Sequence, residues 1–356
     1  MNTRQPLLAL ALCAIATTAI AQNTRIVLQG TGAPQVFTTL DDALAAAQPN
    51  DKLYFSGGTF TSGDGGIEVD IPLHWIGAGI SPDSTNVTAL TMLRTVNGNF
   101  TFTTGAGGSS FTGIHFYPDG GNTFYGNVVQ FGTTTSNDAP LDMVFERCSF
   151  QCKVQLGVPL SGGVGDLTTP GSSSTFNECI FYGQVVAWGL TASTFNKCDF
   201  GSLVDLFQPT GLFMDHCIVR NYIQNCYGIM VKNSVFPYTD FGTIQSNGVM
   251  NNCLFVGGAG TGITTSNNIP NQTGAIFVND PVITDFLWSD DLHLAAGSLG
   301  IGAADDGTDV GIYGSTSPFK AGGVPYNPHY SQATIATSTN PNGELPVNIR
   351  VAAQPN

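Results

Sequence analysis

The chain has 356 residues and a formal net charge of −14, and only 10% of its residues are charged. The 42% hydrophobic content excludes a chain that is mainly disordered, and the scarcity of Lys, Glu and Arg excludes long surface helices. Eleven Lys and Arg residues are too few to neutralise many phosphates, so nucleic acid and anionic membrane surfaces are excluded as main partners. The 44 glycines supply many turns, and the composition therefore predicts an all-β protein.

The N-terminus has the pattern of an export signal. Arg4 precedes an apolar run over 7–15, and Ala19-Ile20-Ala21 is a small-x-small cleavage site. We therefore expect residues 1–21 to be a signal peptide and the mature chain to be secreted, either extracellular or periplasmic. Loss of Arg4 changes the net charge from −14 to −15. No later apolar run is long enough to span a bilayer, so no membrane insertion is expected.

A six-residue pattern recurs along the middle of the chain. Phe145-Glu-Arg-Cys148-Ser-Phe150 matches Phe176-Asn-Glu-Cys179-Ile-Phe181 and Phe195-Asn-Lys-Cys198-Asp-Phe200. Less regular copies occur before and after these three. The fourth residues of all seven copies, here called the column residues, are Ile114, Cys148, Cys179, Cys198, Cys217, Ser234 and Cys253.

The spacing between column residues indicates the fold. The later steps are 17 to 19 residues, and the two early steps of 34 and 31 residues accommodate loops. Such a period is typical of a solenoid, and each unit is long enough for three short strands but too short for paired helices. The expected fold is a single-stranded right-handed parallel β-helix with a short N-terminal cap helix and a C-terminal tail. The expected boundaries are 22–320 for the β-helix with its cap and 321–356 for a tail that packs on it or extends it.

The repeat also predicts which side chains point inward. Cys198 and Phe200 alternate along one strand, and a bend at Asn196-Lys197 brings Phe195 into the same interior. Equivalent residues of successive coils should then stack about 4.8 Å apart.

Loss of Cys13 with the signal leaves seven cysteines, an odd number that argues against full disulfide pairing. Stacked thiols point the same way, so core packing is favoured over a tetrahedral metal site or redox chemistry. Cys152 and Cys226 lie outside the column, and their redox state is left open.

The residue after each column residue points outward, yet this outer row is mostly apolar. It comprises Ser149, Ile180, Asp199, Ile218, Val235 and Leu254. An apolar stripe of this kind is normally covered. We expect either the 321–356 tail or a long loop to pack on it.

Three further stretches resemble the pectate-lyase-like superfamily of bacterial secreted right-handed β-helix proteins. The segment 39–60 is similar to a cap helix with Thr39 as its N-cap, followed by a first strand, and 71–79 is similar to an early coil. The segments 291–298, 301–303 and 309–314 resemble a closing coil. The resemblance covers about 25–320. Function within this superfamily is diverse, and no recognisable enzymatic family is indicated.

The resemblance suggests a search for carbohydrate chemistry. The Asn-Thr-Asp, Gly-His-Gly and Arg-x-Lys motifs of polygalacturonase-like hydrolases are absent, and the strand motif of pectin methylesterases has only a loose echo near Asp205. A lyase would need Arg or Lys as a base. Arg220, Tyr182, Tyr222 and Asp240 are the candidate carbohydrate-binding residues, and a simple surface charge is the alternative interpretation of Arg220.

Calcium is considered only at Asp305-Asp306-Gly-Thr-Asp309, where a structural turn is the favoured interpretation, and no metal site is assigned. The leading hypothesis is a secreted or cell-surface β-helix protein of uncharacterised activity that interacts with carbohydrate. A polysaccharide lyase or glycosidase and an adhesive or structural surface module are the alternatives. Enzymatic activity, ligand identity and oligomeric state stay open.

Overall fold

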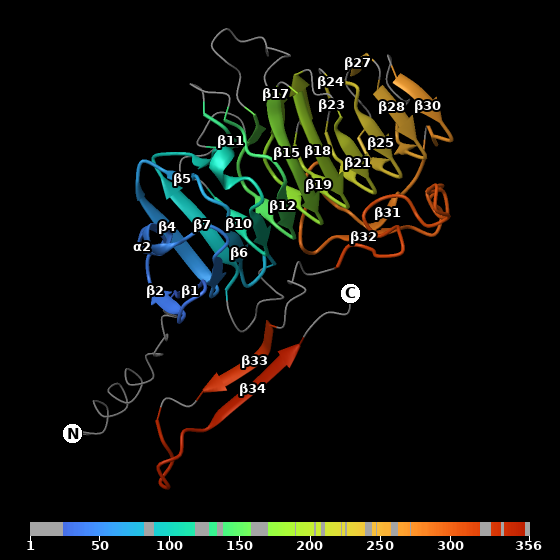
Figure 1. Ribbon diagram of the computed structural model, residues 1–356. Coiled ribbons are helices and arrows are strands. Elements are labelled where there is room, and N and C mark those ends of the chain that lie inside the picture. The colour runs from blue at the N-terminus through green and yellow to red at the C-terminus, as the bar shows by residue number, and fades with distance from the viewer. Residues whose placement is uncertain are drawn as a thin grey trace, which may run out of the picture.

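The computed structural model describes most of the chain in sixteen stretches. They are 24–81, 89–117, 128–133, 138–157, 170–188, 190–202, 204–207, 211–221, 223–224, 226–238, 244–246, 248–257, 263–270, 272–320, 329–335 and 338–352. These residues form an all-β arrangement of mainly parallel sheets with one α-helix, as the composition predicted (Figure 1).

Three large sheets lie along the molecule, and we number them by their order along the chain. The first contains, in spatial order, β2 (Gln35–Phe37), β1 (Ile26–Gln29), β3 (Lys52–Phe55), β6 (His74–Ile76), β9 (Ser110–Thr112), β12 (Met143–Glu146), β15 (Pro170–Asn177), β18 (Leu190–Asn196), β21 (Phe213–Asp215), β25 (Met230–Lys232), β28 (Gly248–Asn251) and β30 (Ile263–Ser266). Its strands pair in parallel except β1, which is antiparallel to β2 and β3.

The second sheet contains β4 (Gly58–Asp64), β7 (Thr91–Val96), β10 (His115–Phe116), β13 (Ser149–Phe150), β16 (Ile180–Phe181), β19 (Asp199–Phe200), β22 (Ile218–Val219), β26 (Val235–Phe236) and β29 (Leu254–Phe255). The third contains β5 (Ile67–Val69), β8 (Phe100–Phe102), β11 (Val129–Phe131), β14 (Val154–Leu156), β17 (Val185–Trp188), β20 (Val204–Phe207) and β23 (Ile223–Gln224). From β3 to β23 the chain visits the three sheets in the same order each time. We call each circuit a coil.

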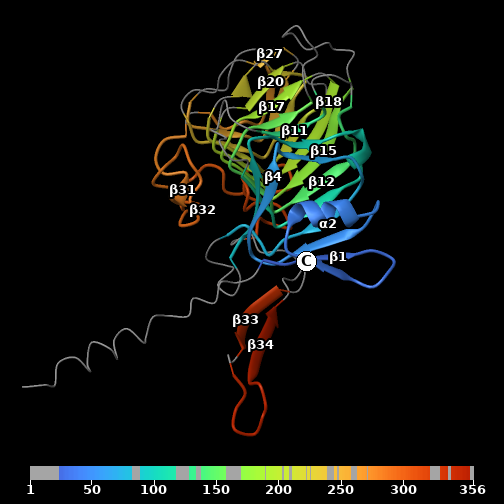
Figure 2. The ribbon, with the colours of Figure 1, turned by 90° about the vertical axis from the view of Figure 1, so that its left-hand side faces the viewer.

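The smaller elements lie at the ends and edges of the sheets. They are α2 (Leu40–Ala46), the 3-10 turn η1 (Thr104–Ala106), the parallel pair β24 (Cys226–Tyr227) and β27 (Ile244–Ser246), and the antiparallel pairs β31 (Phe277–Asn279) with β32 (Asp291–Leu294) and β33 (His329–Ile335) with β34 (Val347–Ala352). Helix α2 lies at the N-terminal end of the stack (Figure 2). The Thr39 hydroxyl accepts a bond from the Asp42 N–H at 3.3 Å, so the expected N-cap is confirmed.

The column predicted from the repeat is present. All seven column residues have 0% exposed surface, and neighbouring strands pair so that successive column residues occupy equivalent positions. Each cysteine of the column bonds through Sγ to a backbone carbonyl of the preceding coil, as Cys198 does to Phe176 O at 3.4 Å. The core therefore satisfies its thiols with backbone acceptors, as buried polar groups require.

Phenylalanine rings stack on both sides of the column. Phe145, Phe176 and Phe195 have centroids 4.8 and 4.9 Å apart, with planes within 10° of parallel. The second phenylalanine of each copy forms an equivalent stack with spacings of 4.9–5.0 Å, made by Phe116, Phe150, Phe181 and Phe200. The predicted inward direction of all three repeat positions is confirmed, since these rings are at most 1% exposed.

The chain bends between the first two sheets at the residue directly before each column residue. At Lys197 this residue is left-handed, with φ 51°. We expected Asn196 to take part in the bend, but it is the last residue of strand β18. Equivalent positive φ angles occur at Gly113, Arg147, Glu178, His216, Asn233 and Asn252. The preference of asparagine for this conformation therefore does not decide the turn, because charged residues adopt it in several coils.

The outer row is covered, as its apolar character predicted. A second hydrophobic cluster joins Ile180, Ile218, Val235 and Leu254 to side chains from 276–319, among them Ile276, Phe277, Phe286, Leu292, Val310, Ile312 and Phe319. We call residues 272–320 the cover segment. Among the residues that the structure describes, this segment rather than the tail covers the row.

The cover segment corrects the expectation of a closing coil at 291–314. Its strands β31 and β32 pair with each other and join none of the three large sheets. From residue 303 onward it runs back along the stack. Ala303 O accepts from Asn252 Nδ2 at 2.9 Å, the Asp305 N–H donates to Asn233 Oδ1 at 2.9 Å, and the Lys320 N–H donates to Glu178 Oε2 at 3.0 Å.

The tail forms the hairpin β33–β34, which lies apart from the sheets in both views (Figures 1 and 2). Leu345, Val347 and Val351 are 49%, 52% and 58% exposed. The predicted domain boundaries at 22–320 and 321–356 stay predictions.

We predict that the buried thiols are unreactive in the folded protein. Cys148, Cys152, Cys179, Cys198, Cys217 and Cys253 are buried and unpaired by disulfides, and burial raises the pKa of Cys152 and Cys253 to about 12. A mature Cys226→Ser variant should react with Ellman's reagent at no site when native and at all six sites in denaturant. Stoichiometric labelling of these thiols in the native protein would contradict the prediction that they are inaccessible to the reagent.

A second prediction concerns His115, which lies buried in the second sheet with Nδ1 2.7 Å from Ser149 Oγ. Burial lowers its pKa to about 4. As the pH falls, the His115 side chain therefore binds a proton in the unfolded chain before it does so in the folded protein. The contribution of neutral His115 to the free energy of unfolding is fully present above about pH 6.5 and is lost as the pH drops toward 4, by about 3 kcal/mol at most. Urea unfolding at pH 7.5 and 4.5 should show a smaller pH effect in His115→Gln, whereas His293→Gln, at a site 61% exposed, should behave like the parent.

Candidate functional site

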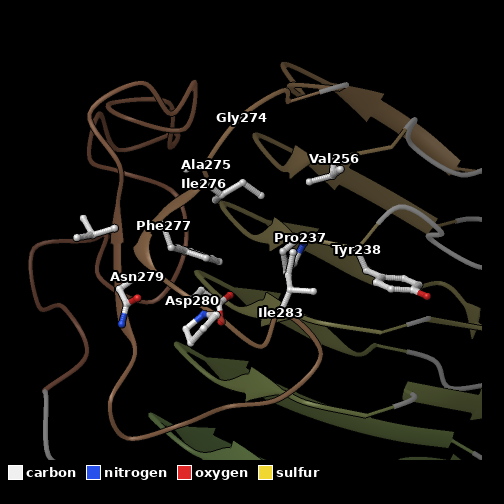
Figure 3. A pocket seen from close by; sticks show the side chains of 12 residues that line it. Pro237, Tyr238, Val256, Gly274, Ala275, Ile276, Phe277, Asn279, Asp280 and Ile283 are labelled. Atoms are coloured by element: carbon white, nitrogen blue, oxygen red, sulfur yellow. The ribbon is translucent and has the colours of Figure 1, made fainter.

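A groove separates the cover segment from the end of the stack. It has a volume of about 560 Å³ and lies where the residues after β26 and β29 face the chain around β31 (Figure 3). Most of its lining is apolar. The lining residues are Pro237, Tyr238, Val256, Gly274, Ala275, Ile276, Phe277, Val278, Asn279, Asp280, Pro281 and Ile283.

Two polar features stand out in this lining. Asp280 brings a carboxylate to the groove, and the Tyr238 ring extends from the opposite wall with its hydroxyl directed away from Asp280 (Figure 3). A concave, mainly apolar surface with a few fixed polar groups is the usual form of a small-molecule site.

The Asp280 carboxylate is held in place by Arg220. Arg220 Nη1 donates to both Asp280 oxygens at 3.0 Å, and its Nε donates to the two Asp199 oxygens at 2.8 and 3.0 Å. Nη1 also lies 3.4 Å from Ile283 O. The guanidinium therefore joins β19 in the second sheet to the cover segment, and it fixes the position of one groove wall.

Burial and charge compete in this cluster. Burial disfavours the Arg220 cation, but Asp199 and Asp280 outweigh that effect and raise its pKa above the usual arginine value. Burial raises the pKa of Asp199, although Arg220 opposes the shift. Burial also raises the pKa of Asp290, and the nearby Asp280 carboxylate adds to the rise. One cation thus serves several carboxylates, and this side of the groove is acidic.

The structure corrects the expectation for Arg220. We considered it as a carbohydrate-binding residue and as a surface charge, but its side chain has 0% exposed surface and is bound by two carboxylates. It is therefore not a surface charge, and in this structure the buried guanidinium has no surface with which to contact a sugar. Its raised pKa also makes it unsuitable as the base of a lyase.

The other candidate residues are only partly brought together. Tyr182 is partly buried and packs edge-on against Phe286 of the cover segment, with ring centroids 6.3 Å apart, and burial raises its pKa. It supports the cover segment rather than offering an open ring. Tyr222 and Asp240 lie outside the described residues.

Sequence reasoning missed Asp280 and Tyr238. The role of Asp199 could have been recognised from the sequence, since it is the charged member of the mostly apolar outer row. Nothing in the sequence pointed to Asp280, because it lies sixty residues from Arg220 and outside any repeat.

The described residues include no group of three or more His, Cys, Asp or Glu side chains arranged to hold a metal ion. The three aspartates considered for calcium face different partners. Asp305 accepts from Asn233 Nδ2 at 2.7 Å, Asp306 from the Thr308 N–H at 2.9 Å, and Asp309 from the Gly302 N–H at 2.9 Å. They close turns and attach the cover segment.

The chain matches no family model, no curated protein and no solved structure. Within the part of the chain that the structure describes, no helix has the length and apolar character needed to cross a membrane.

We predict that Arg220→Met lowers the free energy of unfolding by about 3–5 kcal/mol, because it leaves the Asp199 and Asp280 carboxylates buried without their cation. Adding Asp199→Leu should recover part of the loss, since removing both buried charges costs less than removing one. Guanidinium unfolding followed by circular dichroism measures both.

The matched control is Arg350→Met on the exposed hairpin strand β34, with an expected change within about 0.5 kcal/mol. If Arg220→Met were as stable as this control, the ion pairs of Arg220 with Asp199 and Asp280 would not hold the cover segment in place.

Proposed function

We propose that this protein is an exported right-handed parallel β-helix of the pectate-lyase-like kind that binds carbohydrate. The fixed order of visits to three parallel sheets supports the β-helix, and parallel crossovers are right-handed in nearly all proteins. The export signal at 1–21 supports a secreted location.

The observation that carries the binding proposal is the groove. Its volume of about 560 Å³ suits one or two sugar units, and its walls combine apolar surface, an aromatic ring and a fixed acceptor. Sugar rings stack on aromatic side chains through their C–H faces, while their hydroxyls donate to carboxylates. Asp280 is suited to the second role, because Arg220 holds it in place.

The charge of the site favours a neutral sugar. The protein carries −14 overall, and Asp280 belongs to a cluster with more carboxylates than cations, so a uronate would be repelled. Binding is favoured over lyase chemistry, because Arg220 is unable to act as a base. A glycosidase would need two carboxylates on opposite sides of the sugar, and among the described residues that line the groove only Asp280 carries one.

We predict that Tyr238→Ala weakens binding of a neutral mono- or disaccharide about five- to tenfold, through loss of ring stacking. Isothermal titration with glucose, galactose, mannose, xylose and their disaccharides, and with galacturonate, tests this. Neutral ligands should bind and galacturonate should not.

Tyr117→Ala is the control, since Tyr117 is a 37% exposed tyrosine on a distant coil and is not among the residues that line the groove. It should bind like the parent. Absence of binding across the panel, or equal affinity of Tyr238→Ala and the parent, would overturn the proposal.

A further inference from the structure

The outer face of the first sheet has a continuous row of similar positions. Strand pairing places Val144, Thr175, Thr194, Phe213, Met230, Val249 and Thr264 side by side. We call these seven residues the track. Their strands, from β12 to β30, lie next to one another along the stack (Figure 1). We infer that the track is a second binding site, for an extended neutral polysaccharide.

The track begins in a polar cavity of about 310 Å³. Its lining includes Asp142, Ser173, Thr175 and Thr194. The Ser173 hydroxyl accepts from the Asp142 N–H at 3.0 Å and donates to Asp142 Oδ1 at 3.1 Å, so the two side chains hold each other in place. Hydroxyl and carboxylate groups that are already positioned are suitable partners for sugar hydroxyls.

The track continues as an apolar surface. Phe213 is partly exposed, Met230 is 45% exposed, and Val249 is partly exposed beside it. Lys232 Nζ lies 5.8 Å from the centroid of the Phe213 ring and helps to fix that ring. An aromatic ring and flexible apolar side chains on a flat surface match the C–H face of a sugar ring.

A row of polar side chains runs beside the track at the next outward position. It contains Asn177, Asn196, Asp215, Lys232, Asn251 and Ser266. Asn196 Nδ2 donates to Asn177 Oδ1 at 2.9 Å, and the Ser266 hydroxyl donates to Asn251 Oδ1 at 2.7 Å. Each amide keeps further donors and acceptors, and these can bond to hydroxyls at the edge of a sugar chain.

The spacing and charge of the track identify the ligand class. Its seven strands are about 4.8 Å apart, which gives a straight surface about 29 Å long. In a flat, straight β-1,4-linked chain of glucose, mannose or xylose, the length of one sugar unit is similar to this spacing between strands. Next to the track, Glu146, Asp142 and Asp215 outnumber Lys232, and the protein carries −14 overall, so polyuronates and nucleic acids are repelled.

This site is separate from the groove at Asp280. The track lies on the first sheet, whereas the groove lies between the second sheet and the cover segment. Binding to the track depends on chain length, whereas a groove for one or two sugar units does not distinguish a hexasaccharide from a disaccharide. The inference therefore stands or fails independently of the proposed function.

The test is titration of the mature protein with cellohexaose, mannohexaose and xylohexaose, their disaccharides, and hexagalacturonate. At least one neutral hexasaccharide should bind about tenfold or more tightly than its disaccharide, and hexagalacturonate should not bind. Phe213→Ala should weaken hexasaccharide binding about fivefold or more, and Met230→Ala, at a more exposed site, should weaken it without affecting folding.

Val36→Ala provides the matched control, since Val36 is 63% exposed in β2 of the same sheet but outside the track. It should bind like the parent, and Tyr238→Ala should also leave hexasaccharide binding unchanged. The inference is overturned if no neutral hexasaccharide binds, if chain length has no effect, if hexagalacturonate binds equally well, or if Met230→Ala binds like the parent.

Discussion

One left-handed residue in each coil from β9 onward determines how these coils stack. Six non-glycine residues, from Arg147 to Asn252, turn the chain between the first and second sheets with φ angles of 49–54°. Each such residue costs about 1 kcal/mol or more. The cost is offset because its N–H donates to the next coil, as Glu178 does to Asn196 O at 2.9 Å. Since each of these coils turns at the same point, the column and both phenylalanine stacks stay in register.

The repeated part of the fold could be predicted from the sequence because its information is local. Six residues specify an inward ring, a turn, an inward thiol and a second inward ring, and the steps of 17 to 19 residues place them in equivalent positions. The apolar outer row could be recognised in the same way, together with its need for a cover. The segment that covers this row could not be identified from the sequence, because 276–319 has no repeat and contacts residues many positions earlier in the chain.

The candidate site was less predictable for the same reason. Arg220 follows an inward valine and has the local sequence of a surface residue, yet its partners Asp199 and Asp280 lie 21 and 60 positions away. Their charges interact strongly because all three side chains are at most 6% exposed. Buried ion pairs of this kind contribute little net stability, but they allow only one docking position for the segment that carries them. The groove takes its shape from that position.

The reversed path of the cover segment affects how the molecule comes apart. Units in a linear array touch only their neighbours, so such arrays fray from the ends one unit at a time. Here a single stretch of chain contacts Asn252, Asn233 and Glu178, which belong to different coils. The terminal coils are therefore unable to open before this stretch detaches, and the C-terminal half of the stack should melt as one cooperative block.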